Sequence, residues 1–259
     1  MSGHAPQFPI EDSSWYTRFI QDLLPCAAVL QCAHAQGEAA MATWITHLRL
    51  AEYLMACGLS VDVDSFLAGS VSPDAGAPKQ DGRGYEPPKK ITHWHTARRH
   101  HDVDAYYQRY LKRSNIVLPE KAFHIGYYLH LLADQEWDER VWQPKKRTPL
   151  YQAATQPDSP TAREIKMDWY GLDFLYLRDH PGCVYWSRFR YIERVPDYLD
   201  YLPPGLLTTN IEKILAYYRS PTFSLERPYH YLSQAEIDAY VAAAGEVLLT
   251  ACRERGWIT

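Results

Sequence analysis

The amino-acid sequence predicts an all-α fold, organised as a single domain in which several helices pack as a bundle. Apolar residues recur three and four positions apart through several long stretches, which is the spacing of one face of a helix. No stretch alternates convincingly between apolar and polar residues, as a half-buried strand does. The 259 residues, 46% of them hydrophobic, can bury one sizeable core without a second domain.

Residues 1–40 differ in composition from the rest of the chain and are predicted to be an N-terminal extension to a helical domain spanning residues 41–259. Within the extension, Ser14–Leu24 could form a short amphipathic helix. His34 and Glu38 have helical spacing, but an intervening glycine weakens the helix, so we interpret this pair as structural or exposed.

The first strong helix is predicted from about Ala42 to Cys57, with Gly58 in the position that commonly ends a helix. Leu50 and Leu54 lie on its apolar face, and His47 lies on the same face. A single histidine on an apolar face is usually a core residue, so a ligand role for His47 depends on the other segments.

A short helix follows, capped at its start by Asp62 or Asp64. Gly69 near its end permits close approach of another backbone, and Pro73 then turns the chain outwards. Asp74 is therefore expected just past a helix end, either in an ordinary Pro-Asp turn or facing a site.

Residues 75–90 form a loop rich in Gly, Pro and Lys, which we interpret as a lid or wall beside a site rather than as a linker. His93 and His95 follow on a segment predicted to be extended, where alternate side chains point to opposite sides. At most one of these two histidines should therefore face the site. A further helix is predicted from Asp102 to about Ser114.

The segment Ala122–Trp142 predicts one long helix that is apolar on nearly every face and therefore buried. It carries His130 and Asp134 four positions apart, so their side chains lie next to each other. A buried carboxylate is costly unless it is paired or holds a metal. The pair is either hydrogen-bonded or metal-binding, and Asp138 continues the same stripe by one more turn.

After the central helix, residues 143–149 are predicted to be a basic exposed loop. A helix over about Thr161–Asp179 comes next, and Asp168 and Asp173 flank its apolar face, where exposed carboxylates are expected. Three more helices are predicted, at about Val184–Asp200, Leu206–Arg219 and Ser233–Arg253.

Composition limits the function classes. A formal net charge of −4 gives no global basic field for nucleic acid or an anionic membrane. The five cysteines are odd in number and form no C-x-x-C pair, which favours reduced thiols. No secretory signal and no stretch as long as a transmembrane helix is recognisable, so we expect a cytoplasmic protein. The oligomeric state is not predicted.

Four segments thus offer nitrogen or oxygen ligands without a thiolate, a set that suits zinc or a similar cation. We predict that they meet at a metal site between helices. The residues are His47, Asp74, His93, and the pair His130 and Asp134.

In their order and local context, these motifs resemble the zinc-dependent phospholipase C family, which is related to the single-strand-specific zinc nucleases. The similarity is greatest to a poorly characterised bacterial branch and covers roughly Met41 to Tyr218. The matching motifs are His47 in THLRLAEYL, Gly69 to Asp74 as G-x-x-x-x-D, Thr92-His93-Trp94 as [ST]-H-aromatic, and His130 with Asp134 as H-x-x-x-D.

The resemblance implies a Zn²⁺-dependent hydrolase that attacks a phosphoric (di)ester, with a small-molecule or lipid-headgroup substrate, through zinc-bound hydroxide. Asp74 would be both a ligand and the proton acceptor. One ion would be held by Asp74, His93, His130 and Asp134. A second ion would be bridged by Asp134 and held by His47, with His95, His124, Asp138 or Asp168 as additional or supporting groups.

The sequence also departs from the family. A further metal of the secreted members is held by two later histidines and a glutamate, a set that has no recognisable counterpart after Asp134, and the N-terminal amine that serves as a ligand there has no evident equivalent. A three-metal site is therefore not expected. Arg98, Arg99 or Lys145–Arg147 could help to neutralise a substrate.

Three alternatives remain open. The first is a metal-dependent hydrolase of another ester or amide class. The second is an HD-type phosphohydrolase, for which His101-Asp102 supplies the doublet, although ARRH precedes it where an apolar helical run is usual. The third is a non-catalytic helical binding protein that contains a metal.

Overall fold

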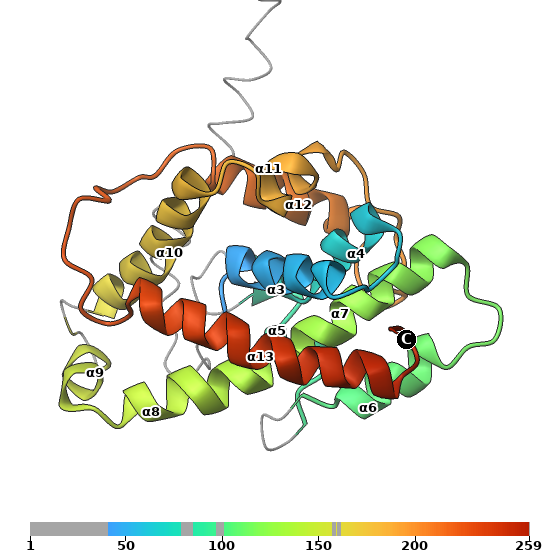
Figure 1. Ribbon diagram of the computed structural model, residues 1–259, viewed down its shortest axis with the longest axis horizontal. Helices are drawn as coiled ribbons and strands as arrows, with labels where there is room; N and C mark the ends of the chain where they lie inside the picture. The colour runs from blue at the N-terminus through green and yellow to red at the C-terminus, as the bar shows by residue number, and fades with distance from the viewer. Residues whose placement is uncertain (1–40, 79–84, 97–100, 157–158, 160–161, 259) are drawn as a thin grey trace, which may run out of the picture.

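The computed structural model describes residues 41–78, 85–96, 101–156, 159 and 162–258, which form a helical bundle (Figure 1). This confirms the predicted all-α class. The predicted extension, residues 1–40, lies outside the described residues. The helices are α3 Trp44–Ala56, α4 Val63–Gly69, α5 Lys89–Thr92, α6 Val103–Tyr106, α7 Leu118–Trp137, α8 Gln143–Lys146, α9 Pro149–Ala154, α10 Ala162–Asp179, α11 Val184–Ser187, α12 Leu206–Tyr217 and α13 Gln234–Glu254.

The central helix α7 is 20 residues long and packs against α3, α4 and α13. It continues through a π-helical turn, Asp138–Trp142, directly into α8. The prediction of an exposed loop over residues 143–149 is therefore wrong for Gln143–Lys146, which are helical. Pro144 lies just after this π-helical turn, and the chain stays helical through it as far as Lys146.

Two glycines bring α4 and α7 into backbone contact. A Cβ atom on Gly69 would lie 2.0 Å from the carbonyl oxygen of Phe123, and one on Gly126 would lie 2.2 Å from that of Phe66. Only glycine fits at such distances. The close approach predicted for Gly69 is confirmed, and it places the turn after α4 directly against α7.

Two local predictions are corrected around Asp74. The segment before His93 is helical rather than extended, because α5 ends at Thr92 and His93 is its last cap residue. Between Asp74 and His93, two short strands pair antiparallel, β1 Ala77–Pro78 with β2 Tyr85–Glu86, although no strand was predicted. Strands of two residues are too short for an alternating pattern to be visible in the sequence.

The helix predicted over Val184–Asp200 is limited to α11 and a 3₁₀ turn, Phe189–Tyr191. Residues 192–199 have no regular structure. Pro196 explains part of this difference, because proline removes a backbone donor and disfavours helical geometry at Val195.

Asp168 and Asp173 of α10 are buried, which corrects the prediction that they are surface carboxylates. Asp173 accepts hydrogen bonds from the hydroxyls of Thr43, at 2.7 Å, and of Tyr218. Thr43 is also the N-cap of α3, so this buried carboxyl fixes the start of the helix that carries His47. Burial raises the pKa of Asp173 to about 7, despite those two hydrogen bonds.

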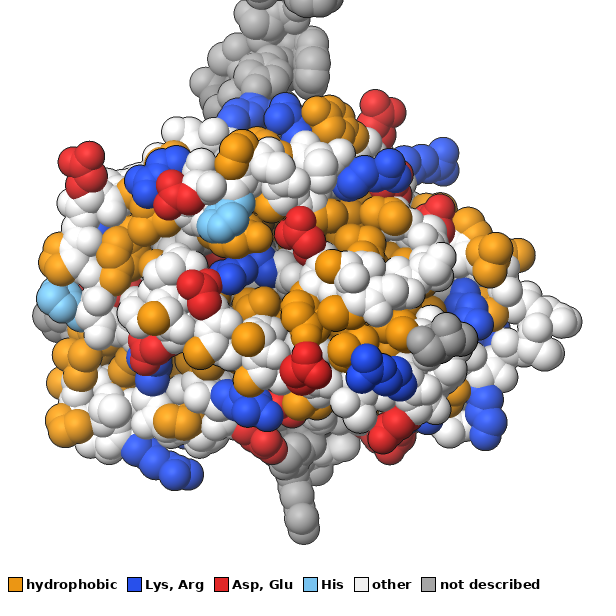
Figure 2. Space-filling model, viewed as in Figure 1, with side chains coloured by type: hydrophobic (Ala, Val, Ile, Leu, Met, Phe, Trp, Pro, Cys, Tyr) orange, Lys and Arg blue, Asp and Glu red, His pale blue; other side chains and the backbone are white. Residues whose placement is uncertain are grey.

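The surface is mixed in character on the face shown in Figure 2, where basic, acidic and apolar side chains are interspersed. Among the described residues, no helix combines the length and the apolar character needed to cross a membrane.

Candidate metal centre

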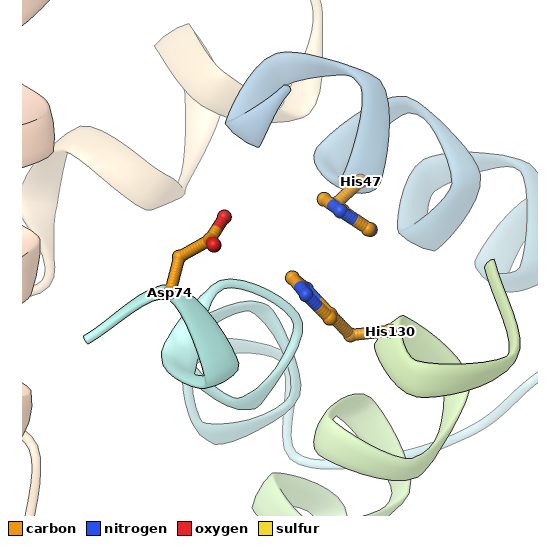
Figure 3. A group of neighbouring side chains, drawn as sticks. All are labelled: His47, Asp74 and His130. Atoms are coloured by element: carbon orange, nitrogen blue, oxygen red, sulfur yellow. The ribbon is translucent and has the colours of Figure 1, made fainter. Parts of the chain in front are cut away.

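The side chains of all five predicted ligands come together in the middle of the bundle. His47 comes from α3, Asp74 from the 3₁₀ turn Ser72–Asp74, His93 from the end of α5, and His130 and Asp134 from α7. Figure 3 shows His47, Asp74 and His130 pointing towards one another from three elements. Their ligand atoms lie within 4.8 Å of one another, as do those of His93, His130 and Asp134. These groups could hold a metal ion.

The carboxylate of Asp134 lies at the centre of the cluster. Its Oδ1 is 3.4 Å from Nε2 of His47, and its Oδ2 is 3.2 Å from Nε2 of His130 and 3.6 Å from Nε2 of His93. Nε2 of His93 is also 3.6 Å from Oδ1 of Asp74. Three of the four distances exceed the roughly 2.7–3.2 Å of an N–H···O hydrogen bond. Ligand atoms around a tetrahedral zinc, with bonds of about 2.1 Å, lie roughly 3.4 Å apart, so the spacing suits a shared cation.

The cluster is buried, and four of its polar atoms lack hydrogen-bond partners. His47, His93, His130 and Asp134 are each at most 2% exposed. Within the described residues, Nε2 of all three histidines and Oδ2 of Asp134 have no hydrogen-bond partner. Burying four such atoms together without partners is costly. A divalent cation would satisfy all four, and the residues present therefore fit a metal.

Contacts behind the histidines orient their rings. Nδ1 of His130 donates to the carbonyl oxygen of Ser70 at 2.8 Å, so its Nε2 presents a lone pair to the cluster. Nδ1 of His93 lies 3.0 Å from Oγ1 of Thr92, whose own proton can go to the carbonyl of Lys89 at 3.4 Å. Partners of this kind fix the tautomer of metal-binding histidines.

The electrostatics favour the metal-binding forms of His47, His93 and Asp134, whereas the pKa of His130 is raised because the adjacent Asp134 outweighs the effect of burial. Burial lowers the pKa of His93 to about 3, although Asp74 lies nearby. Burial and the neighbouring His130 also lower the pKa of His47. Burial alone would raise the pKa of Asp134, but the adjacent His130 and His47 hold it well below its usual range. Neutral imidazoles and ionised carboxylates are the protonation states that ligate metals.

Asp74 lies at the outer edge of the cluster, with 9% of its side chain exposed, against 1% or less for the other four side chains. Nζ of Lys89 donates to its Oδ1 at 3.2 Å. Burial would raise the pKa of this carboxyl, but Lys89 and His93 hold it below its ordinary value. Nζ of Lys213, from α12, donates to the backbone carbonyls of Gly76 at 3.1 Å and Asp74 at 3.4 Å.

The two lysines were not predicted from the sequence. Lys213 lies on a helix that shows only an amphipathic pattern, and Lys89 lies in a loop rich in lysine. One signal was available in the sequence: Lys89 precedes His93 by four positions. This spacing places the two side chains on the same face only if the segment is helical, and the segment was predicted to be extended. Burial lowers the pKa of Lys213 to about 8, although Asp74 lies nearby.

Two predicted supporting histidines point elsewhere. His95 lines an open hollow of about 390 Å³ together with Trp94 and Tyr201. His124 is buried, and its Nδ1 lies 2.7 Å from the hydroxyl of Tyr106. Neither belongs to the two groups of converging ligand atoms. The prediction that at most one of His93 and His95 faces the site agrees with this arrangement.

The two predicted supporting aspartates also lie outside these groups. Asp138 accepts hydrogen bonds from the side-chain amide of Gln143 at 3.1 and 3.2 Å. Asp168 is paired with Arg227 at 2.6 Å and accepts the backbone N–H of Tyr231 at 2.7 Å. Asp168 is therefore a buried structural carboxylate of α10 rather than part of the cluster.

His101, which was considered as part of the His-Asp doublet of an HD-type phosphohydrolase, lies next to the cluster. Its Nδ1 donates to the backbone carbonyl of His93 at 2.9 Å, which supports the end of α5. Asp102, the other half of the His-Asp doublet, caps α6 by accepting the N–H of Ala105 at 3.0 Å. The doublet therefore has local structural contacts that explain both residues.

The structure describes only some of the basic residues predicted to neutralise a substrate. Arg98 and Arg99 lie outside the described residues, and Lys145 is paired with Glu236 at 2.6 Å.

Comparison of the chain with protein-family models, with curated proteins and with solved structures gives no match. The family resemblance remains a prediction, and a function has to be argued from the chemistry of the site.

Proposed function

We propose that this protein is a metal-dependent hydrolase of phosphoric esters, with zinc as the preferred ion. One observation carries the proposal: three buried imidazole nitrogens and Oδ2 of Asp134 face one another without hydrogen-bond partners, at the spacing of ligands around one cation. The donor set contains nitrogen and oxygen only, which suits zinc.

Asp74, His93, His130 and Asp134 would hold one ion, and His47 with the shared Asp134 would hold a second. When bound, zinc supplies a Lewis acid that makes water nucleophilic at neutral pH and stabilises charge on a phosphoryl group. Asp74 is the member of the cluster best placed to accept the proton from water, because it is partly exposed and the Lys89 ammonium keeps its carboxyl ionised.

An anionic substrate is supported by the charges at the exposed edge of the site. The positively charged side chains of Lys89 and Lys213 flank Asp74, where a substrate would enter. Negative charge that develops on a phosphoryl group in the transition state would be stabilised by these groups. The first testable substrate is therefore an activated phosphoric ester.

The test is hydrolysis of p-nitrophenyl phosphate and bis(p-nitrophenyl) phosphate by purified protein of measured zinc content. We expect activity that is lost with a chelator and restored by zinc, and that falls at least a hundredfold in His130→Ala. His180→Ala is the matched control, because His180 is exposed and contacts only its own helix end. Tightly bound zinc without hydrolysis of either ester would instead indicate a non-catalytic metal-binding protein.

A further inference from the structure

The ammonium groups of Lys89 and Lys213 both lie beside Asp74, which is the most exposed of the five predicted ligands. Lys89 comes from α5 and reaches the carboxylate of Asp74, whereas Lys213 comes from α12 and reaches the backbone of Asp74 and Gly76. These lysines lie far apart in the sequence and on separate elements. The fold therefore gathers positive charge at this edge.

Aromatic rings hold both lysines in place. The ammonium of Lys213 lies over the ring of Trp44, 5.4 Å from its centroid, and that of Lys89 lies 5.2 Å from the centroid of Tyr85. Cation–π contacts of this kind favour a charged lysine in a partly dry site. Lysine side chains are flexible, so contacts that order them in advance reduce the entropy lost when a ligand is bound.

The two lysines share a single counter-charge. Lys89 is paired with Asp74, and no carboxylate of the described residues forms an ion pair with Lys213. If Asp74 and Asp134 bind a divalent cation, their two negative charges are balanced by that ion. Both ammonium groups then lack a counter-charge, which is unfavourable at a partly buried position.

We infer that Lys89 and Lys213 form an anion subsite that accepts the terminal phosphate of a phosphomonoester. This inference rests on the proposed function and narrows its substrate class from phosphoric esters in general to phosphomonoesters. A phosphomonoester carries a charge of about −1.5 to −2 at pH 7, which matches two ammonium groups, whereas a phosphodiester carries about −1. The two lysines bind and orient the phosphate, and Asp74 remains the proton acceptor.

The inference is tested by calorimetric titration of the zinc-loaded protein with inorganic phosphate. We expect Lys89→Met and Lys213→Met each to weaken phosphate binding about tenfold or more, since each removes one charge-assisted hydrogen bond. Lys145→Met is the matched control, because it removes the same charge from a lysine that is paired with Glu236, and it should change the affinity less than twofold. Zinc content and thermal unfolding are measured for every variant.

A second measurement does not depend on the folding of the variants. Reductive methylation of the wild-type protein, followed by peptide mass spectrometry, should show Lys89 and Lys213 protected by phosphate, whereas Lys145 should not be. Unchanged phosphate affinity in folded, zinc-loaded Lys89→Met and Lys213→Met, or absence of protection, would overturn the subsite.

Hydrolysis separates this inference from the proposed function. With both correct, p-nitrophenyl phosphate is preferred over bis(p-nitrophenyl) phosphate, and the preference falls at least tenfold in the lysine variants. Lysine-dependent phosphate binding without hydrolysis of either ester would retain the anion subsite and reject the hydrolase. If the protein hydrolyses these esters but the lysine variants keep the wild-type preference between them, the hydrolase is retained and the subsite is rejected.

Discussion

The imidazole rings of His47 and His130 are stacked, with their centroids 3.7 Å apart and an interplanar angle of 13°. Two protonated rings would repel each other strongly at this distance, and burial further disfavours the charged form of His47. At least one of the rings is therefore neutral, and both direct Nε2 at the carboxylate of Asp134. A pre-formed pair of this kind needs little rearrangement to bind a cation.

Zinc should stabilise the folded protein. A ligand that binds only the folded state at one hundred times its dissociation constant adds about 2.7 kcal/mol to the free energy of unfolding. For a domain of this size, that corresponds to a rise in Tm of roughly 5–10 °C. Differential scanning fluorimetry of chelator-treated protein, with and without zinc, measures the shift. Magnesium is the control ion, and a Tm that zinc leaves unchanged would contradict the metal centre.

Substitutions of Asp134 and His47 should have unequal effects on metal content. The carboxylate of Asp134 contacts all three histidines, whereas His47 lies near its Oδ1 and the other two histidines lie near its Oδ2. We expect Asp134→Ala to bind essentially no zinc and His47→Ala to retain one ion per chain. Elemental analysis after dialysis gives the stoichiometry. Asp138→Ala should bind as much zinc as the wild type, and full zinc binding by Asp134→Ala would refute the assignment.

Gly126→Ala should destabilise the protein and weaken its zinc affinity together. The new methyl group would meet the carbonyl of Phe66 at 2.2 Å and force α4 away from α7. Overpacking of this kind costs roughly 1–3 kcal/mol or more. It would also move the Ser70 carbonyl that orients His130. Urea denaturation and zinc titration are the measurements.

The matched control for Gly126→Ala is Gly182→Ala, because a Cβ atom at Gly182 would meet nothing within 4 Å. This substitution should change the free energy of unfolding by less than about 0.5 kcal/mol, as is usual at open surface positions. Equal stability of the two alanine variants would show that the contact between α4 and α7 is not as close as described.

Asp173 should make stability depend on pH. Its folded pKa of about 7 lies above the ordinary 3.8, so between those values the folded carboxyl keeps a proton that the unfolded one loses. The contribution of Asp173 to the free energy of unfolding therefore falls as pH rises from about 4 to 7, by at most about 1.4 kcal/mol per pH unit.

Asp173→Asn keeps a hydrogen-bonding group of the same shape and removes the titration. The difference in unfolding free energy between wild type and Asp173→Asn, measured by urea denaturation at several pH values, isolates this contribution from other titrating groups. We expect the wild type to lose stability relative to the variant as pH rises. Parallel pH profiles would mean that the carboxyl of Asp173 titrates normally.

Local sequence rules determined the longer helices and the type of ligand. Apolar spacing predicted α3, α7, α10, α12 and α13 because one-sided burial imposes a helical period on the sequence. The four-residue spacing of His130 and Asp134 placed them side by side on α7. Gly69 indicated a close backbone approach because only glycine lacks the Cβ atom that would prevent it. Each of these follows from neighbours along the chain.

Only the tertiary structure decided which groups surround the cluster. The burial of Asp168 and Asp173 depends on partners from distant segments, Arg227 and Tyr218 respectively. Lys213 reaches the edge of the site because α12 packs beside the turn that carries Asp74. Contacts between segments distant in sequence leave no periodic pattern in either segment. The sequence by itself therefore determined the longer helices and the chemical nature of the candidate ligands, and packing decided which side chains support these ligands and where positive charge gathers.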